Sequence, residues 1–279
     1  MIIQSAPPGE KRFVCTMVQH LDLCEQFVRA FGNDEFERPE PFDEVVYTVG
    51  HHDRGWDDID AHPILHPASG FPCGIGTGPV PGGFVTTRQS PDFNQARHAY
   101  CGLLASMHSW GLYRDRYGFT EFHPPGGGTS IPIPPPHKDK IEALLDAELD
   151  RQKRLKAELS ADPQTAGWVE ENPLMRNYKI LQFMDTLALY FNLSHRGARG
   201  EERFVHVPKS GDEDATVTMR PIGGDDYAVS PFPFAGDALE ARCTGRYVEP
   251  IADGTEPDDY AATIFSQPES QQTYRLIRG

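Results

Sequence analysis

One apolar stretch decides the fold, the run Leu181-Gln182-Phe183-Met184-Asp185-Thr186-Leu187-Ala188-Leu189-Tyr190. It belongs to a longer segment, residues 174–193, which is apolar enough to predict a helix in the centre of the protein. Asp185 is the only acidic residue of the run. A carboxylate in such surroundings costs several kcal/mol unless it is paired or bound to a cation. The stretch therefore predicts a central helix that carries a charged functional residue.

Further helices are predicted on both sides of this stretch. Apolar residues recur at helical spacing, and breakers such as Gly32, Pro39 and Pro41 stand between the segments. Residues 59–92 are rich in proline and glycine and predict a long loop. The expected helices cover residues 18–31, 42–49, 91–113 and 138–159, in addition to 174–193, and Pro91 suits the first turn of the third.

The character of the sequence changes after Gly200. Residues 203–207, 216–219 and 274–277 are β-rich and are separated by turn residues, whereas residues 12–16 are the one short strand predicted earlier in the chain. We therefore expect a mainly α fold. A helical domain would cover residues 1–199, and a small, antiparallel, β-rich region of residues 200–279 would pack on it.

The composition excludes several classes of function. With 41 acidic and 26 basic residues, the net charge of −15 would repel a phosphate backbone, so we expect no nucleic-acid partner. A small anionic substrate stays compatible, because a local basic pocket can outweigh the overall charge. Five scattered cysteines without a Cys-x-x-Cys pair argue against a disulfide framework, and no signal peptide or membrane-spanning run is evident. We therefore expect a soluble cytoplasmic protein without a membrane partner.

Five residues are the candidates for chemistry, because each lies in a helical and largely apolar context. They are His20 in the first predicted helix, His52 and Asp53 at the end of the second, His108 in the third and Asp185 in the last. Imidazole and carboxylate groups together suit Fe²⁺, Mn²⁺, Co²⁺ or Zn²⁺. A lone histidine in a helix is more often a packing residue, so the prediction of a site with one or two ions rests on the joint pattern of the five.

That joint pattern resembles the HD superfamily of metal-dependent phosphohydrolases and its di-iron oxygenase relatives: a histidine, then a His-Asp pair, then a distant aspartate. The chain is closer still to an uncharacterised bacterial domain-of-unknown-function family, and the similarity spans nearly its whole length. The motifs that carry this similarity are His52-Asp53-Arg54-Gly55-Trp56, Ser106-Met107-His108-Ser109-Trp110-Gly111-Leu112 and Leu181-Gln182-Phe183-Met184-Asp185-Thr186-Leu187.

The resemblance implies an HD-like helical bundle in which His20, His52, Asp53 and Asp185 bind the core metal. His108 resembles the extra histidine that binds a second metal in binuclear members, where the aspartate of the pair bridges. In mononuclear members such a histidine contacts the substrate or acts as an acid.

Other residues near these motifs are weaker candidates. His51 competes with His52, but the register of the Asp-x-Gly-Trp motif favours His52. Arg114 and Arg116 follow His108 closely and are predicted to form a clamp for phosphate or carboxylate, with surface salt bridges as the equally weighted alternative. For the histidines in loops, a surface or loop-packing role is the favoured interpretation; these are His62, His66, His123 and His137.

The leading functional hypothesis is a metal-dependent hydrolase of HD type that acts on a small anionic substrate, foremost a phosphate ester. Asp53, His108, Arg114 and Arg116 are the expected catalytic residues. One alternative is a di-iron oxygenase on the same ligands, and another is a non-enzymatic ligand sensor. The sequence leaves the metal, the substrate and the oligomeric state open. It contains no Gly-x-Ser-x-Gly elbow and no phosphate-binding loop motif.

Overall fold

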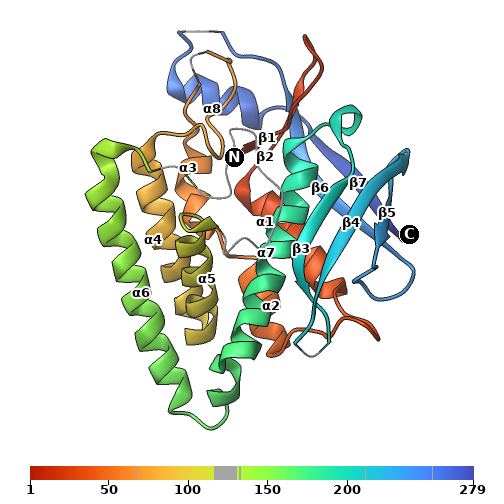
Figure 1. The fold of residues 1–279 in the computed structure, drawn as a ribbon. Helices are drawn as coiled ribbons and strands as arrows, with labels where there is room; N and C mark the ends of the chain where they lie inside the picture. The colour runs from red at the N-terminus through yellow and green to blue at the C-terminus, as the bar shows by residue number, and fades with distance from the viewer. Residues whose placement is uncertain (67, 116–130, 132, 211, 253) are drawn as a thin grey trace.

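The computed structural model describes residues 1–279 except 67, 116–130, 132, 211 and 253 (Figure 1). Helices dominate the first 199 residues and strands the remainder. The helices are α1 (Met17–Ala30), α2 (Phe42–Val49), α3 (Asp57–Ala61), α4 (Val80–Arg97), α5 (Ala99–Gly111), α6 (Lys138–Ser160), α7 (Glu171–Leu193) and α8 (Pro257–Phe265), with short 3-10 turns such as η1 (Arg54–Trp56) between them.

The strands form one seven-stranded sheet in the order β1-β2-β6-β7-β5-β4-β3. Neighbouring strands are antiparallel except β5 and β7, which are parallel, so the sheet is mixed. Residues 12–14 pair with residues 246–248, which joins the beginning of the described chain to its last quarter. The strands are β1 (Ile2–Ile3), β2 (Arg12–Cys15), β3 (Glu202–Pro208), β4 (Asp214–Gly223), β5 (Asp226–Ser230), β6 (Ala238–Val248) and β7 (Glu269–Arg278).

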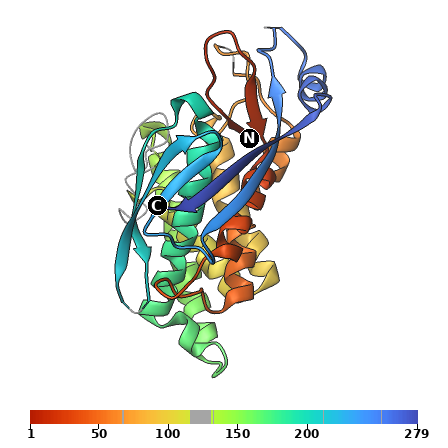
Figure 2. The same cartoon turned by 90° about the vertical axis from the view of Figure 1, so that its right-hand side faces the viewer.

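Most of the helices cover one face of this sheet in layers, whereas α8 packs separately against Val14 and Val248. Helices α1 and α7 lie against the sheet, α2 and α5 pack behind them, and α4 and α6 are outermost (Figure 1). In Figure 2 the sheet faces the viewer and the helical layers lie behind it. Helix α7 is therefore enclosed on all sides, and nearly every residue from Asn177 to Leu193 is buried. The prediction of a central helix from residues 174–193 is confirmed.

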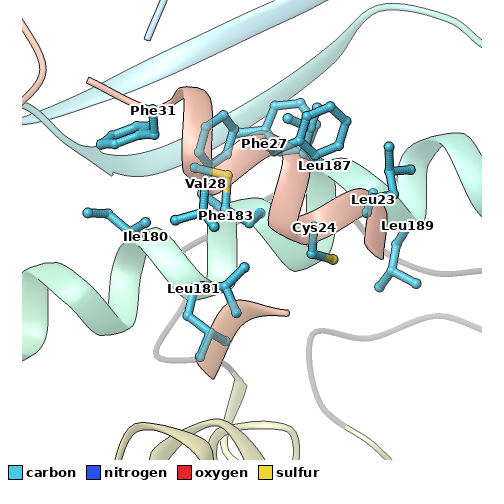
Figure 3. Packing of buried hydrophobic residues seen from close by; sticks show 14 of the residues in the cluster. Leu23, Cys24, Phe27, Val28, Phe31, Ile180, Leu181, Phe183, Leu187 and Leu189 are labelled. Carbon is cyan, nitrogen blue, oxygen red and sulfur yellow. The ribbon is translucent and has the colours of Figure 1, made fainter. Parts of the chain in front are cut away.

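Helices α1 and α7 interlock through large apolar side chains. Figure 3 shows Phe27 and Val28 of α1, together with Phe31 just after its end, packed over Phe183 and Leu187 of α7. A capping box fixes the start of α1, since Thr16 Oγ1 accepts a hydrogen bond from the Gln19 amide and the Gln19 side chain accepts one from the Thr16 amide. The position of His20, one turn into α1, is thereby fixed relative to α7.

The expected fold class was wrong. The chain is about 48% helical and carries a seven-stranded mixed sheet, so it is an α/β protein rather than a mainly α, HD-like bundle with a small antiparallel β region. The expectation failed because β1 and β2, only two and four residues long, were not recognised as members of the later sheet. The sheet thus combines strands from both sides of the proposed boundary at residue 199.

The expected helix at residues 91–113 was also wrong. The chain breaks at His98, which has an extended backbone and whose Nδ1 accepts a hydrogen bond from the Tyr100 amide, so α4 and α5 form a hairpin. Helix α4 starts at Val80, inside the segment predicted as a loop. Its buried residues include Thr86, Thr87, Ser90 and Asn94, and a polar buried face leaves no apolar periodicity to recognise.

No helix in the described part of the chain combines the length and apolar character that crossing a bilayer requires.

Candidate metal centre

The His-Asp motif occupies the turn between α2 and η1. Helix α2 ends at Val49, and the two histidines that follow point in different directions. His51 stacks on Tyr47 with 4.1 Å between ring centroids and also stacks on Phe93. His52 is completely buried. The side chain that enters the interior is therefore His52, as the motif register predicts.

Two side chains of helix α4 form hydrogen bonds with the backbone of this turn. The Asn94 side-chain amide donates to the His51 carbonyl at 2.8 Å, and the Gly55 amide donates to Ser90 Oγ at 3.1 Å. Gly55 lies so close to α4 that an added Cβ would meet Ser90 Oγ and the Thr86 carbonyl oxygen, each at 2.7 Å. The glycine of the motif thus permits the close contact that positions His52 and Asp53.

A first group of potential metal ligands joins three elements. His20 from α1, His52 from the turn after α2 and Asp185 from α7 are all buried, and their donor atoms lie within 4.8 Å of one another. Nε2 of His20 is 3.2 Å from Asp185 Oδ1, and Nε2 of His52 is 3.8 Å from the same oxygen. The donor set suits a divalent transition metal, which this group could hold.

The protons of these two histidines point away from the group. Nδ1 of His52 lies 2.8 Å from the Val49 carbonyl, and Nδ1 of His20 lies 2.8 Å from Asn192 Oδ1. Both partners only accept hydrogen bonds, so in the neutral rings each Nδ1 carries the proton and each Nε2 presents a lone pair. Nε2 of His52 is buried and has no hydrogen-bond partner among the described residues. A metal ion would supply the partner that this nitrogen lacks.

A second group shares His52 with the first. It consists of His52, Asp53 and His108, again with donor atoms within 4.8 Å. The carboxylate of Asp53 lies 4.0 Å from Nε2 of His52 and 3.9 Å from Nε2 of His108. The side chain of Asp53 is 16% exposed, whereas those of the other four residues are at most 4% exposed. Solvent therefore reaches the centre beside Asp53.

The structure thus brings together all five predicted ligands, and it adds residues that the sequence analysis missed. Asn192 orients His20, and Ser90 and Asn94 hold the turn. Cys24 Sγ lies 3.5 Å from His20 Nε2, and burial, followed by the charges of Asp185 and Asp53, raises the pKa of its thiol. Spacing was the available signal, because Cys24 follows His20 by four residues and Asn192 follows Asp185 by seven, which places each pair on one helix face.

Of the predicted arginine clamp, the structure describes only Arg114. Arg114 pairs with Glu142 of α6 at 2.5 Å and lies 5.9 Å from the centre of the Trp110 ring. Arg116 lies outside the described residues, as does His123. A role of Arg114 and Arg116 in anion binding stays a prediction.

The centre predicts a pH dependence of the metal-free protein. Burial lowers the pKa of His52, but the carboxylates of Asp185 and Asp53 outweigh it, so the pKa is raised above its ordinary value of 6.5. The folded state therefore holds this proton more tightly than the unfolded chain, and the resulting stability is lost as the pH rises through the raised pKa. We expect the Tm measured with a chelator to fall between about pH 6 and pH 8, the histidine range. A His52→Gln variant should lose this decline; an equal decline in both proteins would contradict the assignment.

Fold and centre together define an α/β protein with a buried histidine–aspartate centre that could hold a metal ion. Comparison with protein families assigns the chain more closely. Residues 1–250 match the family described as "Protein of unknown function (DUF3891)", and the chain belongs to that family. No curated protein matches the chain. No solved structure matches it either.

Proposed function

We propose that this protein is a metal-dependent hydrolase that acts on a small anionic substrate, with phosphate esters as the leading class. The order of its candidate ligands, a histidine, a His-Asp pair and a distant aspartate, is the order found in HD-type enzymes. The proposed kinship lies in this ligand pattern, since the seven-stranded sheet sets the overall fold apart from a helical bundle.

One observation carries the proposal. Two buried imidazoles have their Nδ1 protons engaged by acceptors on the outer side, and their Nε2 lone pairs converge on the buried carboxylate of Asp185. Without a cation, the centre relieves this arrangement only by holding a proton, as the raised pKa of His52 indicates, and a bound metal ion would take the place of that proton. This arrangement supports metal binding better than it supports core packing.

The position of Asp53 favours hydrolysis. It is the one member of the centre with marked access to solvent, so water and substrate would arrive beside its carboxylate. There Asp53 can orient a water molecule and accept its proton, while the buried His108 faces the same space from α5. A divalent ion in the first group would lower the pKa of bound water and polarise the scissile bond.

A di-iron oxygenase is the second candidate, and the second ligand group supports it. The sharing of His52 weighs against it. Because Nδ1 of His52 is engaged by Val49, its Nε2 offers a single lone pair, which serves one ion only. Filling both groups would leave one ion with two of these ligands. A ligand sensor without catalysis is the third candidate.

The adjacent histidines provide a matched test. We expect purified protein loaded with Mn²⁺ or Co²⁺ to release phosphate from a member of a broad phosphoester panel. His52→Ala should lower metal affinity at least about 100-fold and abolish release, because it removes a ligand. His51→Ala should retain both properties, since His51 stacks on Tyr47 outside the centre.

The other possible results of these tests distinguish the three candidate functions. Silence across the panel with metal bound would reject the phosphatase proposal and leave the sensor. Two irons per chain together with oxygen consumption would favour the oxygenase. Equal metal loss in both histidine variants would contradict the centre itself.

A further inference from the structure

We infer that Gln182 of α7 fixes the proton of His108 on Nε2, so that His108 faces the centre as a hydrogen-bond donor and not as the ligand of a second ion. Gln182 is thus a positioning residue that sets the number of metal ions the centre takes. The inference rests on the proposed function, in which His20, His52 and Asp185 hold one ion.

The three histidines of the centre differ in the hydrogen-bond partner of Nδ1, the ring nitrogen that faces away from the centre. His20 and His52 each have an acceptor there, an amide oxygen and a backbone carbonyl. The orientation of the Asn192 amide is supported on its other side, where its Nδ2 donates to Cys243 Sγ at 3.3 Å. Acceptors on Nδ1 leave Nε2 unprotonated, which is the form of imidazole that binds metals.

His108 meets a donor instead. Its Nδ1 lies 3.0 Å from Nε2 of Gln182, and an amide nitrogen donates hydrogen bonds but accepts none. Nδ1 of His108 must therefore carry the lone pair, and the proton of the neutral ring lies on Nε2. Gln182 precedes Asp185 by three residues on α7, so one helix supplies both a metal ligand and the group that sets the tautomer.

The Nε2–H of His108 points to the side of the centre where Asp53 lies. It lies 3.9 Å from Asp53 Oδ1, and the His108 ring meets the His52 ring edge to face with centroids 4.6 Å apart. A protonated nitrogen has no lone pair for a metal, but it can donate to an anionic oxygen of a substrate held beside Asp53. The second ligand group is thereby reserved for substrate.

Two substitutions that add the same charge separate this idea from general electrostatics. Gln182→Glu replaces the donor by an acceptor, which moves the proton of His108 to Nδ1 and frees Nε2 for a metal. Gln152→Glu makes the same exchange at a buried glutamine of α6, whose Nε2 donates to Ser106 Oγ outside the centre. Metal-free protein would be titrated with Co²⁺ alone, and the number of ions per chain and the visible absorption of Co²⁺ would be recorded.

We expect one Co²⁺ per chain in the unmodified protein and in Gln152→Glu, and a second ion in Gln182→Glu, bound at least about 10-fold more tightly than any second ion in the other two. His108→Leu should still bind one ion. If circular dichroism shows that Gln182→Glu does not fold, the number of ions bound by His108→Leu decides the question. Two ions in the unmodified protein with one in His108→Leu would overturn the inference and leave the metal enzyme intact. No ion in the unmodified protein would reject the proposed function, and this inference with it.

Discussion

Asp185→Asn is expected to lower metal affinity at least about 100-fold and to abolish hydrolysis. Asp185 contributes the only carboxylate of the first ligand group, and its Oδ1 lies within 3.8 Å of Nε2 of both His20 and His52. Asparagine keeps the size of the side chain but removes the negative charge that balances a divalent cation. Isothermal titration with Zn²⁺ or Mn²⁺, followed by the phosphoester assay, measures both effects.

The matched control for this change is Asp22→Asn. Asp22 is an exposed carboxylate on α1, two residues from His20. Its replacement by asparagine removes an equal charge close to the centre without removing a ligand. We expect its metal affinity to stay within about threefold, because exposed charges near the surface are screened. Metal binding that survives Asp185→Asn unchanged would show that the ion, if any, binds elsewhere.

Gly55→Ala is expected to destabilise the protein by about 3 kcal/mol and to impair metal binding at the same time. An added methyl group would meet Ser90 Oγ and the Thr86 carbonyl at 2.7 Å and the Ser90 amide nitrogen at 2.9 Å. Two of these atoms belong to the backbone of α4, so the motif turn must move away. The movement breaks the hydrogen bond from Gly55 to Ser90 and shifts His52 and Asp53.

Urea unfolding with and without metal would measure this effect. Gly167→Ala is the control, since an added Cβ at Gly167 has no atom within 4 Å. It should leave both stability and metal affinity nearly unchanged. Full metal affinity in a destabilised Gly55→Ala protein would mean that the turn and the centre are not coupled.

The sequence was informative where one residue broke a strong pattern. Asp185 in an apolar helix and the His-Asp pair at a helix end could be recognised because burial of a charge is costly whatever the rest of the fold is. The supporting residues could not be found in this way. Asn192 is a small polar group whose role depends on which helix lies opposite, and α1 and α7 meet across more than 150 residues of sequence.

The sheet was harder to predict than the helices for a related reason. Helix α7 is defined by neighbours three and four residues apart, whereas the place of β2 is set by β6, far along the chain. The prediction missed the first part of helix α4 for another reason. The buried face of this helix includes Thr86, Thr87, Ser90 and Asn94, which are polar. Apolar periodicity reports only on faces that bury apolar side chains.

The pairing of residues 12–14 with residues 246–248 has a consequence for biosynthesis. While the ribosome is still translating the final strands, α1 and α7 can already fold, yet their sheet side stays uncovered. Phe27 and Phe183, which both contact Phe234 in the finished protein, would be exposed during that interval. Sheet closure is therefore a late, long-range event, and until it occurs the uncovered aromatic surface favours aggregation.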